Sequence, residues 1–449
     1  MSTNSSLTPT PAADPTIEGL PPGPSLAFVQ LARFVRNSDA YLAAGIKRYG
    51  DPFHYRAPGI SLSVTANPEI IEQIYGAPAG TFGVDAWVIA PLVGENSLLG
   101  MNGERHQRDR KLLMPPFHGA RMRTYGAVIR EAALEASDRI QPGESFRALE
   151  LTQHITIEVI LRAVFGVVER SRRERYRHAI AAWMESVNPL FLMVRSLRHP
   201  FFPPWRRYSR ALATLDALIF EEIEQRQQSQ PGEDILSLMM AARYDDGAAM
   251  SRQELRDQLL TLLLAGHETS AVSIAWALYE LHRNPTVLEK LLDEVESQPL
   301  DCAPDDLMGL PYLEAVCKET LRLHPVTPNV PKQLNVQMKL GKYLLPAGAG
   351  VTIAFGAVHQ RPDLYPEPTL FRPERFLERK FGPFEFLPFG GGNRRCIGAA
   401  FAMYEIKLVL AELLRRYRFR LSRIAPERTV LRSVTLGPAN GVPMVLERN

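Results

Sequence analysis

Hydrophobic residues recur with a helical period along much of the chain and alternate as in strands mainly towards its ends. Helical spacing is clearest in three stretches, 125–140, 152–165 and 211–227. Short runs typical of strands occur at 60–65, 336–345, 350–354 and 429–446. The pattern therefore predicts a mostly α-helical protein with a smaller β portion.

One predicted helix is longer than the rest. Ser251 and Glu254 have the spacing of a capping box, and Asn284-Pro285 supplies a stop signal roughly thirty residues later. At 1.5 Å per residue this helix spans roughly 45 Å, enough to cross a whole domain. Residues 259–264 are apolar on nearly every face, which indicates that the helix is buried.

Two residues inside this helix break local rules. Gly266 costs about 1 kcal/mol relative to alanine in a helix interior, and a buried, unpaired Glu268 carboxylate would cost several kcal/mol. Either the pair marks a functional site, or Gly266 relieves a helix crossing while Glu268 points to solvent. The helix alone favours neither interpretation.

Composition fits an ordinary globular protein. The 449 residues contain no long linker and no repeat after residue 24, so we predict a disordered tail over 1–24 and a single domain over 25–449. The balance of 52 Lys and Arg against 49 Asp and Glu argues against a nucleic-acid partner. Three cysteines are too few for a disulfide framework, which favours a reducing, cytoplasmic location. The most apolar run, 259–266, is shorter than the ~20 residues that span a bilayer, so no membrane span is expected.

A glycine-rich loop, 390–392, leads to Cys396 at the start of a second apolar helix. Backbone N–H groups at the helix start, the helix dipole and Arg394 should lower the pKa of the thiol. A phosphate loop would need a following Gly-Lys-Ser/Thr, and a zinc site would need a second nearby Cys or His. A nucleophile would require a base, whereas an axial ligand of haem iron requires nothing more.

The set Phe389, Gly392, Arg394, Cys396 and Gly398 resembles, at its spacing, the haem-binding signature of the cytochromes P450. The resemblance covers nearly the whole chain and is closest to soluble bacterial members with eukaryote-like motifs. It implies the P450 fold, with haem b between the long helix and the cysteine loop and Cys396 as the iron ligand.

Further motifs follow in the order that the resemblance implies. Glu319 and Arg322 are similar to the family's Glu-x-x-Arg, and Arg375 is similar to the arginine that completes this structural network. His106 and Arg110 resemble a motif that contacts a haem propionate. Lys332 stands where the family often has arginine, and lysine lacks the bidentate fork.

The resemblance also assigns roles on the other side of the haem. Gly266 would open a groove in the long helix, Thr269 would hydrogen-bond reduced dioxygen, and Glu268 would relay protons. By position, the mostly apolar substrate pocket would include Trp87, Leu264, Ala265, Val326, Asn329, Val330 and Leu436. Arg56 is either an anchor for a fatty carboxylate or an ordinary surface arginine.

The implied function is a monooxygenase that hydroxylates or epoxidises a terpenoid, a steroid-like compound or a fatty acid. Electrons would come from a ferredoxin or flavodoxin with its reductase, and we expect a monomer. A positive docking face is predicted from seven basic residues, together with Arg108 and Lys111. The seven are Arg394, Arg395, Lys407, Arg415, Arg416, Arg418 and Arg420. The alternatives are a non-catalytic haem-thiolate sensor or carrier, and haem-dependent isomerisation or dehydration without external electrons.

Overall fold

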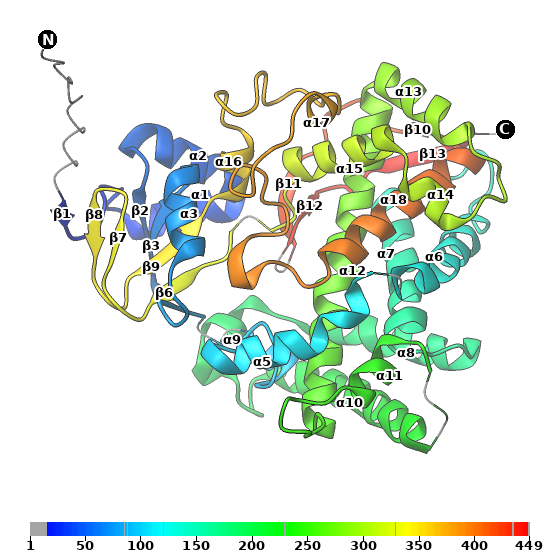
Figure 1. Cartoon of the computed structure of the whole chain (residues 1–449), viewed down its shortest axis with the longest axis horizontal. Helices are drawn as coiled ribbons and strands as arrows, with labels where there is room; N and C mark the ends of the chain where they lie inside the picture. The colour runs from blue at the N-terminus through cyan, green and yellow to red at the C-terminus, as the bar shows by residue number, and fades with distance from the viewer. Residues whose placement is uncertain are drawn as a thin grey trace, which may run out of the picture.

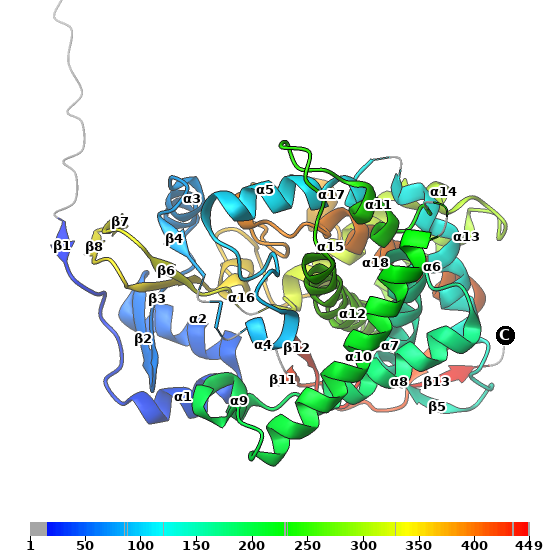
Figure 2. The same cartoon turned by 90° about the horizontal axis from the view of Figure 1, so that it is seen from below.

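The computed structural model describes residues 16–447, apart from positions 85, 88, 120, 229, 231, 328, 433 and 434. A large helical region adjoins a smaller region rich in strands (Figure 1 and Figure 2). Each region has its own hydrophobic core. The arrangement confirms the predicted mostly α-helical fold with a smaller β portion.

The long predicted helix is α12 (Arg252–Arg283), which runs through the middle of the helical region (Figure 1). The Ser251 hydroxyl accepts the Glu254 N–H at 3.2 Å, and the Glu254 carboxylate accepts the Ser251 N–H at 2.8 Å, as the capping box predicted. Within the described residues, α12 alone is long and apolar enough to cross a membrane by composition, yet 67% of that window is buried inside the fold. It therefore has the character of a core helix.

Three helices pack directly on α12 and carry residues of interest: α7 (Ala148–Val159), α15 (Pro311–Leu323) and α18 (Ala399–Arg416). The predicted stretch 152–165 corresponds to the end of α7 and a π-helical turn, Ile160–Val164. The predicted stretches 125–140 and 211–227 correspond to α6 and α10, which begin four and eight residues earlier than predicted. The remaining helices are α1 (Ala27–Arg36), α2 (Ser38–Tyr49), α3 (Pro68–Gly76), α4 (Ala90–Val93), α5 (Gly103–Leu113), α6 (Arg121–Ser137), α8 (Arg170–Ser186), α9 (Pro189–Met193), α10 (Pro203–Gln228), α11 (Ile235–Ala241), α13 (Pro285–Glu296), α14 (Pro304–Met308), α16 (Phe355–His359) and α17 (Arg375–Glu378).

The largest sheet has five strands in the order β2-β3-β9-β6-β4, with β3 antiparallel to β2 and parallel to β9. The predicted run 336–345 forms a hairpin of two short strands because the chain turns at Gly341, where φ is 59°. The run 429–446 divides into three strands. The strands are β1 (Ile17–Glu18), β2 (Phe53–Ala57), β3 (Ile60–Thr65), β4 (Phe82–Gly83), β5 (Ser145–Arg147), β6 (Lys332–Leu334), β7 (Met338–Leu340), β8 (Tyr343–Leu345), β9 (Gly350–Ile353), β10 (Arg418–Leu421), β11 (Thr429–Arg432), β12 (Thr435–Pro438) and β13 (Pro443–Glu447).

The start of the described chain is attached to the strand-rich region. Strand β1 pairs in parallel with β8, and the His54 N–H donates to the carbonyl oxygen of Pro22 at 2.8 Å. The predicted boundary of the tail at residue 24 is therefore too late. Residues 1–15 of that predicted tail lie outside the described residues.

Candidate functional site

Cys396 ends the glycine-rich loop just before α18. Its N–H donates to the carbonyl oxygen of Phe389 at 2.9 Å. Gly392 has a φ of 60°, a conformation that glycine adopts without steric cost. A side chain at Gly391 would lie 2.7 Å from the ring of Tyr75. The glycines therefore allow the loop to fold tightly against that ring.

Cys396 is exposed, as are Gly392, Asn393 and Arg395 in the same loop, yet the surrounding protein atoms desolvate the thiol. Burial raises the pKa of the Cys396 thiol, while the N–H of Gly398 and the charges of Arg110 and Arg395 lower it. The net direction is upward, so the predicted lowering of this pKa is wrong, although the local N–H group and the positive charges do act in the predicted direction. A coordinated metal ion deprotonates a thiol outright, which would restore the thiolate.

The surroundings of Cys396 suit a metal that is bound mainly by a cofactor and takes one ligand from the protein. Among residues 16–447 as described, no three His, Cys, Asp or Glu side chains form a metal-binding cluster. A zinc site made of protein ligands alone therefore does not fit. A single thiolate beneath a macrocycle does fit, because the macrocycle supplies the other ligands.

Three cations, Arg110 on α5, Lys332 on β6 and Arg394 after the glycine loop, form what we term the cation cluster. Burial and the charge of Arg394 lower the pKa of Lys332 to about 8. Burial and the charge of Arg110 lower the pKa of Arg394 to about 10. In the described part of the chain, no carboxylate forms an ion pair with any of the three. Positive side chains that lie close together without a carboxylate are expected where the protein binds an anion.

His106 lies one turn before Arg110 on α5 and is 3% exposed. Burial and the charges of Arg394 and Arg110 lower its pKa to about 4, so its imidazole is neutral at pH 7. Arg394 itself donates to the carbonyl oxygens of Leu98 and Met101. The loop before α5 therefore holds the Arg394 guanidinium in place.

Glu319, Arg322 and Arg375 form what we term the ion triad. Arg322 Nε lies 2.7 Å and Arg375 Nε 3.0 Å from the Glu319 carboxylate. All three side chains are at most 3% exposed. Arg322 also donates to the carbonyl oxygens of His359 and Pro368, each at 2.8 Å. The contacts match the structural network that the family resemblance implied.

The middle of α12 contains an exposed residue, Ala265, between buried turns. The Thr269 hydroxyl donates to the Ala265 carbonyl oxygen at 2.5 Å, one turn away. A side chain at Gly266 would lie 3.3 Å from Ile160 Cδ1. Gly266 therefore relieves a close helix contact, and α12 continues through it without a break.

Glu268 does not point freely to solvent, because its residue is only 9% exposed. Gln153 Nε2 on α7 donates to the carboxylate at 2.8 Å, and Arg432 Nε on β11 lies 3.9 Å from it. Sequence reasoning missed both partners, which are distant in the chain and carry no local motif. The surface-facing alternative for Glu268 is therefore wrong.

The cytochrome P450 family model matches residues 20–442. The chain is a cytochrome P450. It is 35% identical to cytochrome P450 135B1 of Mycobacterium tuberculosis, with 94% of this chain and 90% of the relative covered. Cytochrome P450 138 of the same species is 33% identical, with 98% and 99% covered. The family consists of monooxygenase oxidoreductases that bind haem b.

Solved structures show the same fold. A cyanobacterial P450, CYP120A1 with retinoic acid bound, has a TM-score of 0.85 at 24% identity and covers 96% of this chain and 99% of its own. The haem domain of cytochrome P450DA has a TM-score of 0.85 at 22% identity, with 97% and 99% covered. Both confirm the predicted P450 fold.

Haem fits the residues present in this P450. Cys396 offers one exposed sulfur to the iron. The cation cluster has no carboxylate partner among the described residues, and the two propionates of a haem would supply the missing negative charge. Space is also available, because a side chain at Gly398 would have no neighbour within 4 Å.

The expected pocket residues divide into enclosed and exposed members. The Leu436 N–H donates to the Val326 carbonyl oxygen at 2.7 Å, which joins β12 to the loop after α15. Trp87 and Val330 are 37% and 46% exposed. Asn329 hydrogen-bonds weakly with Thr352, at 3.4 Å, while Leu264 on α12 is partly buried.

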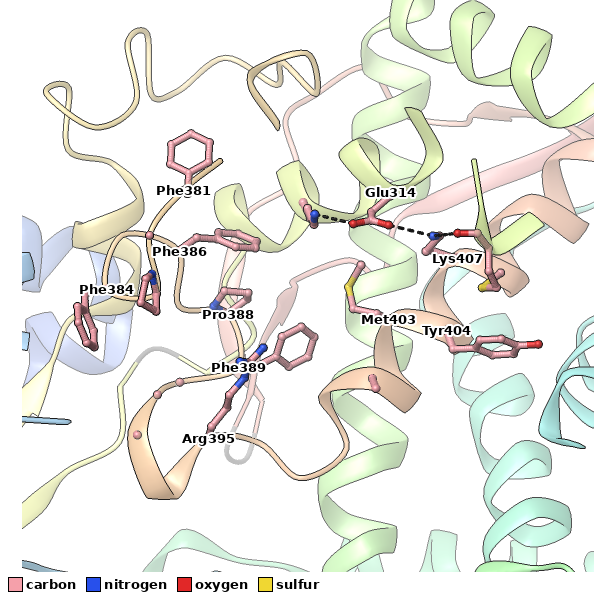
Figure 3. Close-up of a pocket in the computed structure, with 18 residues that line it drawn as sticks. Glu314, Phe381, Phe384, Phe386, Pro388, Phe389, Arg395, Met403, Tyr404 and Lys407 are labelled. Carbon is pink, nitrogen blue, oxygen red and sulfur yellow. Dashed lines mark hydrogen bonds and ion pairs between the residues drawn. The ribbon is translucent and has the colours of Figure 1, made fainter. Parts of the chain in front are cut away.

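A separate cleft of about 600 Å³ lies on the cysteine loop, α15 and α18 (Figure 3). None of its described lining residues comes from α12, so it is not the expected substrate pocket. Phe389 and Arg395 line it together with Glu314, which pairs with Lys407 at 3.3 Å.

The predicted positive face on this side is largely neutralised. Lys407 and Arg415 are buried, and Arg394 belongs to the cation cluster. Carboxylates pair with the other three, Arg416, Arg418 and Arg420. Within the described residues, Arg395 alone of the seven is exposed without a carboxylate partner. Arg108 and Lys111, which were predicted to extend this face, pair with Asp109 and Asp245, so most of the predicted positive charge is compensated within the protein.

Proposed function

We propose that this P450 hydroxylates or epoxidises a hydrophobic small molecule with one oxygen atom from O₂. The substrate classes are terpenoids, steroid-like compounds and fatty acids, and a ferredoxin or flavodoxin with its reductase supplies electrons. The observation that carries the proposal is the Thr269 hydroxyl beside exposed Ala265, with buried Glu268 next to it. A monomeric, cytoplasmic enzyme remains part of this proposal.

Bound haem supplies the activation of dioxygen through its thiolate-ligated iron. In this chain, Cys396 would provide the thiolate and the cation cluster would bind the propionates. Thr269 offers a hydroxyl that can exchange its Ala265 acceptor for an oxygen-bearing ligand in the adjacent space. Glu268 can exchange a proton with solvent on the side of Arg432, which is 40% exposed.

The first experiment is an optical titration of the oxidised holoenzyme with fatty acids, sesquiterpenes and steroids. Retinoic acid is added because a structurally similar P450 binds it. Displacement of water from the iron moves the Soret band to shorter wavelength. Shifts with fatty acids alone would make Arg56, which is exposed on β2, the carboxylate anchor to test by substitution. Shifts with neutral ring compounds alone would exclude that anchor.

The second experiment measures product per NAD(P)H for Thr269→Ala with the ligand thus identified. Loss of the hydroxyl should lower this yield severalfold while reductant consumption continues. Ser273→Ala is the matched control, because Ser273 makes the same backward hydrogen bond on α12, at 2.9 Å, but is buried. An unchanged yield in Thr269→Ala would exclude the relay.

Two other outcomes would replace the proposal. Ligand binding without any turnover, in the presence of several ferredoxins and flavodoxins, would indicate a sensor or carrier. Full activity without a reductase would indicate isomerisation or dehydration.

A further inference from the structure

The chain between β4 and α5, residues 84–102, forms what we term the pocket loop, because it contains the expected pocket residue Trp87. The two ends of the pocket loop are joined. The Val84 N–H donates to Asn102 Oδ1 at 2.7 Å, and Asn102 Nδ2 donates to the Val84 carbonyl oxygen at 2.9 Å. The closed base leaves the middle of the loop to be positioned by other elements.

A buried carboxylate on α12 holds the middle of the pocket loop. Asp257 is 1% exposed. Its Oδ2 accepts the backbone N–H of Asn96 at 3.0 Å and the Asn96 side-chain Nδ2 at 2.9 Å. Gly94 has a φ of 90°, and a side chain there would overlap the Asp257 carboxylate. The backbone of the loop therefore lies directly against this carboxylate, and glycine permits the approach.

Two further residues of α12 bind the same part of the loop. Gln258 Nε2 donates to the Asn96 carbonyl oxygen at 2.6 Å, and the hydroxyls of Ser97 and Thr261 are hydrogen-bonded at 2.7 Å. Thr261 lies one helical turn before the exposed residue Ala265. The contacts with the loop therefore end at the edge of the expected substrate pocket.

The charge of Asp257 is balanced within the protein. Arg256 donates to Asp257 Oδ1 at 2.8 Å and to the two carboxylate oxygens of Asp216 on α10 at 2.8 and 2.7 Å. Without Asp257, Arg256 would still have Asp216 as its partner. The short helix α4, within the pocket loop, packs beside α12 (Figure 2). The loop is thus held against α12 by one carboxylate whose removal leaves no buried charge unpaired.

We propose that Asp257 is a positioning residue that fixes the pocket loop before a ligand binds and so sets the affinity for ligands large enough to reach the loop. The inference rests on the substrate pocket of the proposed function. A ligand that meets an ordered loop does not lose affinity to the ordering of that loop. A small ligand that occupies only the iron position would be indifferent to the loop.

The first test is an optical titration of the full-length holoenzyme with two azoles. Imidazole itself is small, whereas clotrimazole is an imidazole that carries three aromatic rings. Both bind haem iron through a ring nitrogen and move the Soret band to longer wavelength. Asp257→Ala should weaken clotrimazole binding about tenfold, because hydrogen bonds to a charged acceptor are lost from the loop, and should change imidazole binding less than about twofold.

The second test measures hydrogen exchange of the backbone amides by mass spectrometry. The peptide that contains residues 94–98 should exchange at least about tenfold faster in Asp257→Ala, because the loop opens more often. Asn96→Ala removes a hydrogen bond from the loop side and leaves the Asp257 carboxylate paired with Arg256. It should change both measurements in the same direction by a smaller factor.

Glu222→Ala is the matched control. Glu222 on α10 is 2% exposed and pairs with Arg172 and Arg226, so this variant also loses a buried, paired carboxylate. It contacts no part of the pocket loop through these pairs. The ratio of the two azole dissociation constants and the exchange of residues 94–98 should both stay as in the wild type.

Three results would overturn the proposal: equal weakening of both azoles in Asp257→Ala, unchanged exchange of the pocket loop in that variant, or the same changes in Glu222→Ala. A wild type that bound neither azole would count against the pocket of the proposed function. The exchange measurement needs no ligand and no turnover, so it would still decide whether Asp257 holds the loop.

Discussion

The ion triad and the cation cluster both place charge inside the protein, but in opposite ways. In the ion triad, one carboxylate meets two guanidiniums at 2.7 and 3.0 Å, away from solvent. In the cation cluster, burial and the charge of Arg394 lower the pKa of Lys332, burial and the charge of Arg110 lower that of Arg394, and no described carboxylate pairs with any of the three. The difference indicates which charges support the fold and which await an external anion.

Glu405 on α18 shows a third way to bury an ionisable group. It is 2% exposed, and its Oε1 has no hydrogen-bond partner. Burial raises its pKa to about 8, against a smaller lowering by a hydrogen bond from Ser270. Glu405 is therefore mostly protonated at pH 7 and avoids the need for a counter-charge.

The largest effect is expected from Glu319→Gln in the ion triad. The substitution leaves two buried guanidiniums without their carboxylate, and breaking such a pair costs about 3–5 kcal/mol. Urea unfolding followed by the Soret band and circular dichroism measures the loss. A variant too unstable to retain haem would agree with this expectation.

The matched control is Glu378→Gln, which breaks the pair with Arg372 at the surface. Those side chains are 53% and 39% exposed, and exposed pairs contribute about 0–1 kcal/mol. Equal losses in the two variants would mean that the triad gains nothing from its burial.

The next effect concerns Glu405→Gln and depends on pH. The folded carboxyl has a pKa of about 8 against an ordinary 4.5, so folding retains a proton that the unfolded chain releases. Stability should fall as pH rises from 5 to 8, by at most about 1.4 kcal/mol per pH unit. Glutamine does not titrate, so the stability of the variant relative to the wild type should increase as pH rises.

Thermal unfolding of both proteins across this pH range makes the comparison. Glu289→Gln on α13 is the control, because Glu289 is exposed, and its difference from the wild type should not vary with pH. A constant difference for Glu405→Gln would show that Glu405 is ionised in the folded protein throughout.

The sequence predicted features that depend on neighbours in the chain. The ends of α12 follow from Ser251, Glu254 and Asn284, which act within one helical turn. The spacing between Glu319 and Arg322 likewise places both on one helix face. Such contacts join residues close together in the chain, so they can be predicted from the sequence.

Features that depend on residues distant in the chain could not be predicted from the sequence. Nothing near Glu268 indicated Gln153 or Arg432. The direction of the Cys396 pKa was wrong because burial, a property of the folded chain, outweighs the local positive charge. The basic run failed as a docking face for the same reason, since carboxylates such as Glu296 approach it only in the fold.

The smallest effect tests whether Lys332 belongs to the cation cluster. Its ammonium lies 4.7 Å from the ring centre of Tyr75 and 5.4 Å from that of Phe82, so the two rings alone could account for its position. If it binds a propionate, Lys332→Gln should speed haem transfer to apomyoglobin about tenfold, or about 1.4 kcal/mol. Lys339→Gln, an exposed lysine on β7, should leave that rate unchanged. Equal rates in the two variants would restrict the propionate site to Arg110 and Arg394 and assign Lys332 to the aromatic pair.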